Sequence, residues 1–146
     1  LAGIERGAVF QRYSSDNTFW YLLLCRLLVM GVLMPDCIFC EVVSQNLSAA
    51  IVEESNHAIA FRDISPQAPT HVLVIPKKHI SSLDKASEQD CQLLGELLLM
   101  ANRVAVNQNL DSNYRIVINN GSKAGQSVFH IHLHVLGGRP MQWPPG

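Results

Sequence analysis

The sequence predicts an α+β domain in which an antiparallel sheet of five strands is accompanied by one long helix and one short helix. Two observations support this prediction. After Cys37, short apolar runs alternate with polar turns, which is typical of antiparallel strands. Between the third and fourth runs, apolar residues recur near the helical period from Ser87 to about Asn109. Strands joined by turns, with one helix between two of them, favour an α+β fold.

The first elements follow from local patterns. Residues 37–44 (CIFCEVVS) predict a short helix, for which Asp36 would be the N-cap. The apolar runs 50–54 and 58–62 are separated by polar residues and predict a hairpin. Residues 63–70 (DISPQAPT) contain two prolines and turn-forming residues, so they are expected to form a loop.

The remaining strands are read in the same way. The run 71–75 (HVLVI) predicts a strand that ends at a proline, and 114–118 predicts another. A glycine-containing loop over 119–127 then leads to a final strand over 128–136. Adjacent prolines exclude regular structure from the tail 141–146.

Composition and charge limit the class of protein. The chain has 146 residues, of which 48% are hydrophobic and 16% charged, as expected of a soluble, well-packed domain. Its formal net charge of -1 provides no general attraction to nucleic acid or to an anionic membrane, so an anionic ligand needs a local site. Four cysteines are too few for a disulfide framework, which favours a reduced, cytoplasmic setting. They are Cys25, Cys37, Cys40 and Cys91.

Residues 1–33 are expected to lie outside the domain, which would comprise residues 34–146. The stretch from Phe19 to Met34 is almost continuously apolar, but Arg26 interrupts it and it is shorter than a membrane-spanning helix requires. We interpret residues 1–33 as an upstream extension; a targeting or membrane-surface segment is the alternative.

The segment 128–136 (VFHIHLHVL) is the most informative part of the chain. Side chains alternate between the two faces of a strand, so its three histidines would share one face and the intervening apolar residues the other. Histidines two residues apart on a strand lie about 6.5–7 Å apart, far enough for each to act separately. Two other readings are a set of histidines that face water and a catalytic metal site. The histidines are His130, His132 and His134.

The heptapeptide 130–136 (HIHLHVL) resembles the signature of the histidine-triad nucleotide-binding family. Further segments resemble its phosphoramidase branch: GQSVF at 125–129, DISPQAPTH at 63–71, LVIPKKH at 73–79 and the ending GGRPMQWPPG at 137–146. The resemblance extends from about Met34 to Gly146. It implies an α+β fold of this family and a homodimer in which the two sheets join, and the apolar excess of residues 93–100 agrees with a helix that also packs on a partner.

The resemblance implies a catalytic role for four residues. His132 would attack phosphorus and form a covalent nucleotidyl-histidine, which requires a neutral imidazole with a free lone pair. His130 and His134 would flank it, with His134 near the phosphate. The Ser127 hydroxyl would help to protonate a departing amine.

The resemblance also assigns substrate-binding residues. Asp63 would bind both ribose hydroxyls, although by itself an aspartate before Ser-Pro reads as a turn former. Asn119 would contact the phosphate, and the loop 120–125 could offer backbone N–H groups. The apolar base pocket, whose members could equally be plain core, would comprise Ile38, Phe39, Val42, Leu47, Phe61, Ile64 and Leu73. Gly125, Gln126, Val128 and Trp143 complete the implied set, with Trp143 reaching towards the partner's site.

The pair Cys37 and Cys40 has the spacing of zinc ligands but supplies only two of them. Bacterial members of the family complete a structural zinc site with two histidines, and the matching positions are read as His71 and His130. The alternatives are two inert thiols or a redox pair. No cofactor is expected to be required for the reaction, and His57 and His79 are read as surface residues.

The expected function is hydrolysis of purine nucleoside 5′-phosphoramidates by a homodimer that binds neither nucleic acid nor membranes. A dinucleoside polyphosphate hydrolase is a second reading; Ser127 argues against it, because the branch that prefers those substrates has a glutamine near that position. A third is a nucleotide-binding regulatory protein whose activity is incidental.

Overall fold

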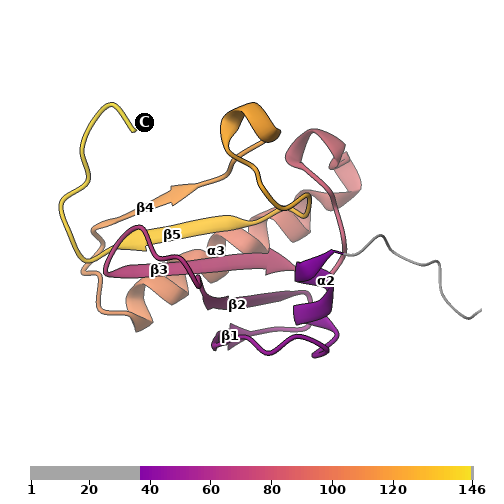
Figure 1. Cartoon of the computed structure of the whole chain (residues 1–146), viewed down its shortest axis with the longest axis horizontal. Helices are drawn as coiled ribbons and strands as arrows, with labels where there is room; N and C mark the ends of the chain where they lie inside the picture. The colour runs from indigo at the N-terminus through magenta and orange to yellow at the C-terminus, as the bar shows by residue number, and fades with distance from the viewer. Residues whose placement is uncertain (1–36, 146) are drawn as a thin grey trace, which may run out of the picture. The chain divides into compact units, whose positions relative to one another are not determined.

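The computed structural model describes residues 37–145, and Figure 1 shows a five-stranded antiparallel sheet with one long helix packed against it. The strands are β1 (Ile51–Glu54), β2 (Ala58–Arg62), β3 (Thr70–Pro76), β4 (Tyr114–Val117) and β5 (Leu133–Gly137), in the order β1-β2-β3-β5-β4. The predicted α+β class and the number of strands are confirmed. The predictions for residues 1–33, including Cys25, lie outside the described residues, and the prediction of Asp36 as N-cap of the short helix is wrong, because Cys37 is the N-cap.

Two α-helices accompany the sheet. The short helix α2 spans Ile38–Val43 with Cys37 at its N-cap, and the long helix α3 spans Cys91–Asn107. A 3₁₀ turn, Glu88–Asp90, precedes α3, and Ser87 and Asp90 form a reciprocal capping box around it. The predicted long helix is therefore present, with its first turn in 3₁₀ form. No helix within residues 37–145 is long and apolar enough to cross a membrane.

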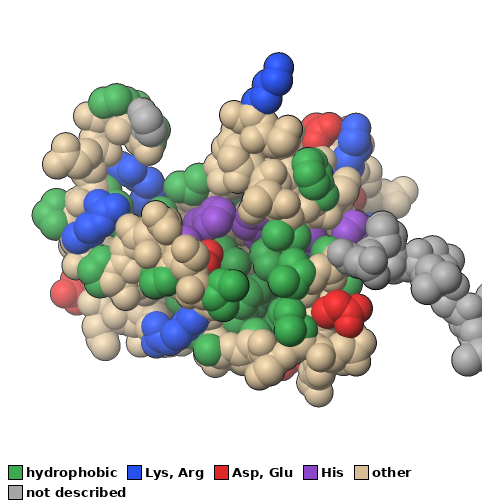
Figure 2. Space-filling model, in the orientation of Figure 1, with side chains coloured by type: hydrophobic (Ala, Val, Ile, Leu, Met, Phe, Trp, Pro, Cys, Tyr) green, Lys and Arg blue, Asp and Glu red, His purple; other side chains and the backbone are tan. Residues whose placement is uncertain are grey.

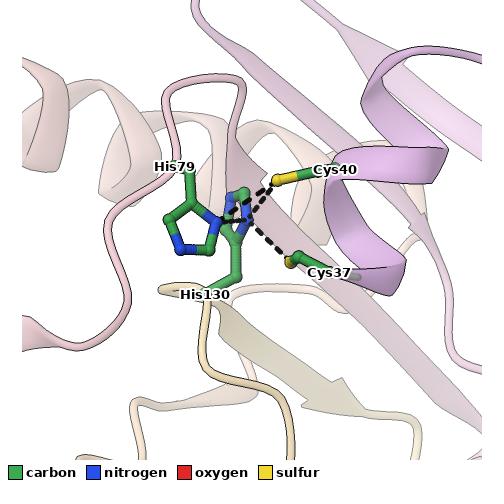
Figure 3. A group of neighbouring side chains, drawn as sticks. All are labelled: Cys37, Cys40, His79 and His130. Carbon is green, nitrogen blue, oxygen red and sulfur yellow. Dashed lines mark hydrogen bonds between the residues drawn. The ribbon is translucent and has the colours of Figure 1, made fainter. Parts of the chain in front are cut away.

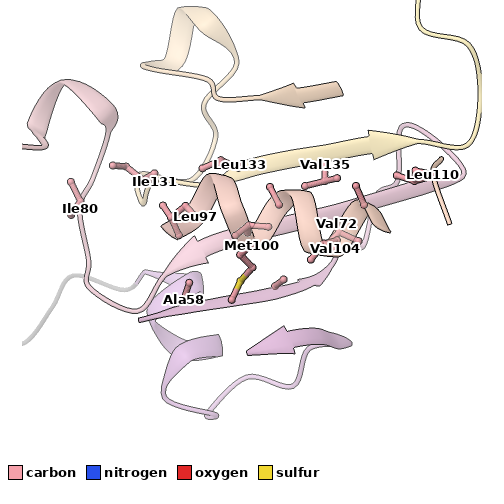
Figure 4. Close-up of a cluster of buried hydrophobic side chains, with 14 residues drawn as sticks. Ala58, Val72, Ile80, Leu97, Met100, Val104, Leu110, Ile131, Leu133 and Val135 are labelled. Atoms are coloured by element: carbon pink, nitrogen blue, oxygen red, sulfur yellow. The ribbon is translucent and has the colours of Figure 1, made fainter. Parts of the chain in front are cut away.

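Helix α3 covers one face of the sheet. Its buried residues Leu97, Met100 and Val104 pack against every second residue of the strands, such as Val72 on β3 and Val135 on β5 (Figure 4). Burying each such side chain contributes about 1.5–3 kcal/mol. Ile131, Leu133 and Val135 all belong to this core, so the alternation inferred from the histidine segment is confirmed on its apolar side.

A second, smaller core lies on the opposite face of the sheet. Phe61 on β2 and Leu73 on β3, which alternate with residues of the α3 core, pack there against Phe39 and Val42 of α2. Strands β2 and β3 are therefore buried on both faces, which explains why their sequences read as nearly continuous apolar runs.

The last strand is shorter than predicted, because β5 begins at Leu133 and not at Val128. Its pairing with β3 reaches Val74 opposite Leu133, and β3 ends two residues later at Pro76, which has no N–H to donate. The ladder with β3 therefore stops two residues before the end of β3. The Ile131 N–H donates instead to the Ile80 carbonyl at 2.7 Å, so the three histidines do not lie on one continuous strand.

Candidate active site and metal cluster

A cavity of about 600 Å³ opens on the α2 face of the sheet. All seven apolar residues predicted for the base pocket line it, and Asp63, Ser127, Val128, His132 and His134 line it as well. Figure 2 shows hydrophobic side chains gathered beside histidine side chains at the centre of this face. The cavity therefore joins an apolar part to a polar part, as a ligand with an apolar ring and a charged group would need. Residues that the sequence did not indicate are Ser48, Ala49, Ala50 and Arg62.

His132 is held in one tautomer. Its Nδ1 lies 2.8 Å from the backbone carbonyl oxygen of His130, and a carbonyl only accepts, so Nδ1 carries the proton of the neutral ring. The Nε2 atom therefore has its lone pair free. The ring is 4% exposed and its centroid lies 5.3 Å from that of Phe39, in an edge-to-face contact. A buried imidazole with a fixed lone pair is suited to nucleophilic attack.

His134 is oriented by a chain of hydrogen bonds that begins at the backbone. The Gln67 N–H donates to Nδ1 of His71 at 3.1 Å, which leaves the His71 proton on Nε2. That Nε2 lies 2.9 Å from Nδ1 of His134 and donates to it, so His134 carries its own proton on Nε2. Burial lowers the pKa of His134 to about 4, and the ring is therefore neutral near pH 7. His134 can act as a hydrogen-bond donor in the cavity.

Asp63 combines the two roles that the sequence left open. Its Oδ1 accepts the Ser65 N–H at 2.7 Å, which closes a turn of the loop, and the residue also lines the cavity. Its Oδ2 lies 3.4 Å from Nε2 of His71. The Asp63 carboxylate therefore contacts the turn and the buried His71, and the residue also lines the cavity.

Hydrogen bonds of the Gln126 side chain hold the glycine-containing loop in place. Gln126 is 3% exposed; its Oε1 accepts the Gly121 N–H at 2.8 Å, and its Nε2 donates to the carbonyls of Ser81 and Val128. The polar atoms of the Gln126 side chain therefore hold the loop, and Gln126 does not line the cavity, so its predicted part in substrate binding stays a prediction. Gly125 has φ of +93° and packs beside Asn119, and neither lines the cavity. Trp143 is 84% exposed and does not line the cavity of its own chain.

The first histidine of the triad points away from the cavity, into a cluster with Cys37, Cys40 and His79 (Figure 3). Nδ1 of His130 lies 3.5 Å from Sγ of Cys37, 3.6 Å from Sγ of Cys40 and 3.2 Å from Nδ1 of His79. Nδ1 of His79 lies 3.3 Å from Sγ of Cys40. The expected fourth ligand, His71, is wrong: it belongs to the His134 chain, and His79 takes its place.

The cluster fits a tetrahedral zinc ion. With Zn–S bonds of about 2.3 Å and Zn–N bonds of about 2.05 Å, tetrahedral geometry separates two nitrogens by about 3.3 Å and a nitrogen from a sulfur by about 3.6 Å. The measured separations of 3.2 Å and of 3.3–3.6 Å agree with these values. In addition, Nε2 of His130 donates to the Pro76 carbonyl at 2.8 Å, the second hydrogen bond that a metal-binding histidine usually makes.

Burial lowers the pKa of His130 to about 4, so its ring is neutral near pH 7 and Nδ1 has a lone pair for a metal. Because His130 serves the cysteine cluster and His132 is fixed by a backbone carbonyl, the three histidines of the triad do not converge. A catalytic metal held by the triad alone, one of the readings of the sequence, is therefore excluded by their placement.

The fold and the cavity define a protein with a ligand site of mixed apolar and histidine character on one face of an antiparallel sheet. A family model described as the HIT domain matches residues 44–141. An uncharacterized HIT-like protein of Synechocystis is 51% identical over 111 residues, which cover 76% of this chain and 97% of that protein. The chain belongs to the HIT domain family.

Two solved structures extend the comparison. A HIT family hydrolase from Legionella pneumophila superposes with a TM-score of 0.75 at 47% identity, covering 76% of this chain and all of that chain. A histidine triad nucleotide-binding protein from Candida albicans superposes with a TM-score of 0.65 at 30% identity, covering 75% of this chain and 83% of that chain.

Proposed function

We propose that this protein is a hydrolase of purine nucleoside 5′-phosphoramidates that uses His132 as its nucleophile. The observation that supports this most directly is the fixed tautomer of His132, whose Nδ1–H is bound to the His130 carbonyl while the ring lines the cavity. The names of the similar structures, a HIT family hydrolase and a histidine triad nucleotide-binding protein, agree with a nucleotide as substrate.

The proposed reaction has two displacements at the α-phosphorus. In the first, Nε2 of His132 forms a bond to phosphorus while the bond from phosphorus to the amine breaks, and the amine leaves with a proton delivered through the Ser127 hydroxyl. In the second, water attacks phosphorus, the bond to His132 breaks, and the nucleoside monophosphate and a proton are released. His134, with its proton on Nε2, would donate to a phosphate oxygen in both transition states.

The two parts of the cavity suit the two parts of such a substrate. Phe39, Phe61 and Leu73 offer apolar surface to a base, and the Asp63 carboxylate offers acceptors to ribose hydroxyls. Ser127 at the polar end favours a leaving group that needs a proton, such as an amine, over a polyphosphate chain. A dinucleoside polyphosphate hydrolase is therefore the second candidate and not the first.

We also propose that Cys37, Cys40, His79 and His130 hold a structural zinc ion. Bound there, zinc would join α2 to the segments that carry the two histidines and would stabilise the fold. The donor set is closed, with four protein ligands and no open position for water, as in structural sites. The reaction proposed above needs no metal.

A homodimer belongs to the same proposal. Leu98, Leu99 and Val106 are exposed apolar residues of α3, and β4 is an edge strand of the sheet. Exposed apolar side chains beside an unpaired edge fit a two-fold interface with a second copy of this chain.

The function is tested with a panel of substrates and one variant. The purified protein should cleave adenosine 5′-phosphoramidate and guanosine 5′-phosphoramidate with higher kcat/KM than diadenosine polyphosphates. His132→Ala should abolish turnover and still bind AMP, because the apolar residues and Asp63 remain. Rapid quench with substrate labelled at phosphorus should trap an adduct on His132. Near-normal turnover by His132→Ala, or an adduct on another residue, would refute the mechanism; a preference for the polyphosphates would favour the second candidate.

A further inference from the structure

Helix α2 provides apolar walls for the cavity and packs on the sheet through Phe39 and Val42, but few hydrogen bonds connect it to the rest of the described chain. Ile38, Phe39 and Val42 all line the cavity. Within residues 37–145, the backbone hydrogen bonds made by 37–47 stay inside that segment. The side-chain hydrogen bonds that leave the segment all come from Cys37 and Cys40, and all of them reach His79 or His130.

Phe39 connects this cluster with the reactive part of the cavity. Phe39 lies between Cys37 and Cys40 in sequence. Figure 3 shows the side chains of these two cysteines pointing from the start of α2 towards the two histidines. Its ring makes edge contacts with His130, His132 and Phe61, with centroid separations of 6.0, 5.3 and 5.7 Å. The position of Phe39 therefore depends on its packing in the smaller core and also on how firmly both cysteines are held.

We propose that zinc bound by Cys37, Cys40, His79 and His130 sets the affinity of the cavity for the nucleoside, by holding α2 in its ligand-binding position. The proposal rests on the function argued above, in which a nucleotide occupies the cavity. In the metal-free cluster the contacts are those of thiols with imidazoles, which are weak hydrogen bonds. Four metal bonds would replace them and link α2 to the segments before β5 and after β3.

The expected size of the effect follows from the population of the binding-competent arrangement. If α2 is in place in about one tenth of metal-free molecules, the apparent Kd rises about tenfold, which corresponds to about 1.4 kcal/mol. The reciprocal also holds: nucleotide binding should tighten the retention of zinc by the same factor.

The test measures AMP binding by titration calorimetry on the full chain, in zinc-loaded, chelator-treated and zinc-refilled forms, together with the zinc content of each. Chelation should weaken AMP binding about tenfold and refilling should restore it. In hydrogen exchange, chelation should reduce the protection of amides in α2 more than in α3. Cys91→Ser, which removes an exposed cysteine outside the cluster, should change neither zinc content nor affinity.

Two variants make the test decisive. Phe39→Ala should lower AMP affinity in the zinc-loaded form and reduce the response to chelation. If chelation unfolds the whole domain, His79→Ala, which retains three ligands and leaves α2 unaltered, should bind AMP with an affinity that rises with added zinc. Equal AMP affinity with and without zinc in the folded protein would overturn the inference while leaving the proposed function intact. Absence of AMP binding in every form would instead count against the proposed function.

Discussion

Replacing His71 should impair catalysis although His71 does not line the cavity. In His71→Phe an aromatic ring of somewhat larger volume is kept, but His134 loses the donor 2.9 Å from its Nδ1, and the Gln67 N–H loses its acceptor. Leaving a buried polar group without a partner costs about 1–3 kcal/mol. If that cost falls on the orientation of His134 in the transition state, kcat should decrease by about 5-fold to 150-fold, since 1.4 kcal/mol is tenfold.

The assay is steady-state hydrolysis of adenosine 5′-phosphoramidate, with thermal unfolding measured alongside to separate lost activity from lost fold. His71→Gln is the matched control, because its amide can donate to His134 and it should retain more of kcat than the phenylalanine variant. AMP affinity should change less than kcat in both. If His71→Phe folds and keeps the kcat of the parent, or if the two variants are equally impaired, the orienting role of His71 is refuted.

Three further outcomes are expected. Burial lowers the pKa of His134 to about 4, whereas an unfolded histidine titrates near 6.5, so the unfolded chain binds more protons between these pH values. The stability contributed by the neutral ring is therefore complete above about pH 6.5 and is lost as the pH falls towards 4. Urea unfolding at pH 7 and pH 5 should show this loss of stability, with a shallower pH dependence in His134→Asn. Leu97→Ala should lower the free energy of unfolding by urea by about 2–5 kcal/mol, since Leu97 is fully buried. Light scattering at micromolar concentration should give the mass of a dimer, and Leu99→Lys should shift it towards the monomer; a monomeric parent protein would contradict the proposed interface.

Most of the fold could be predicted from the chain because its signals are local. The apolar runs of β2 and β3, the helical period of α3 and the turn formers of 63–70 each depend on neighbouring residues. The start of β5 could not be predicted in this way. It depends on where the chain joins β3, opposite Val74, and on the contact of Ile131 with Ile80, which are properties of the folded chain and not of residues 128–132 alone.

The sequence also indicated some residues of the candidate site and missed others. Asp63, Ser127, His132 and His134, which each match a family motif in sequence, all line the cavity, and their catalytic and binding roles stay predictions. The place of His79 beside Cys37 and Cys40 was missed, and His71 was expected there instead, because the two histidines lie at opposite ends of the same apolar strand. Which of them meets Cys40 depends on the turn after Pro76, whose path is set by tertiary contacts such as that between Ile131 and Ile80.

Strand β3 belongs to both hydrophobic cores, with Val72 and Val74 facing α3 and Leu73 and Ile75 facing the cavity side. Because β3 contributes side chains to both cores, its own hydrogen bonds open only when both cores are disrupted, as in global unfolding. The slowest-exchanging amides should therefore lie in β3. A molecule captured in the cavity would then raise the melting temperature of the entire domain, so that ligands can be found by thermal-shift screening without any assay of turnover.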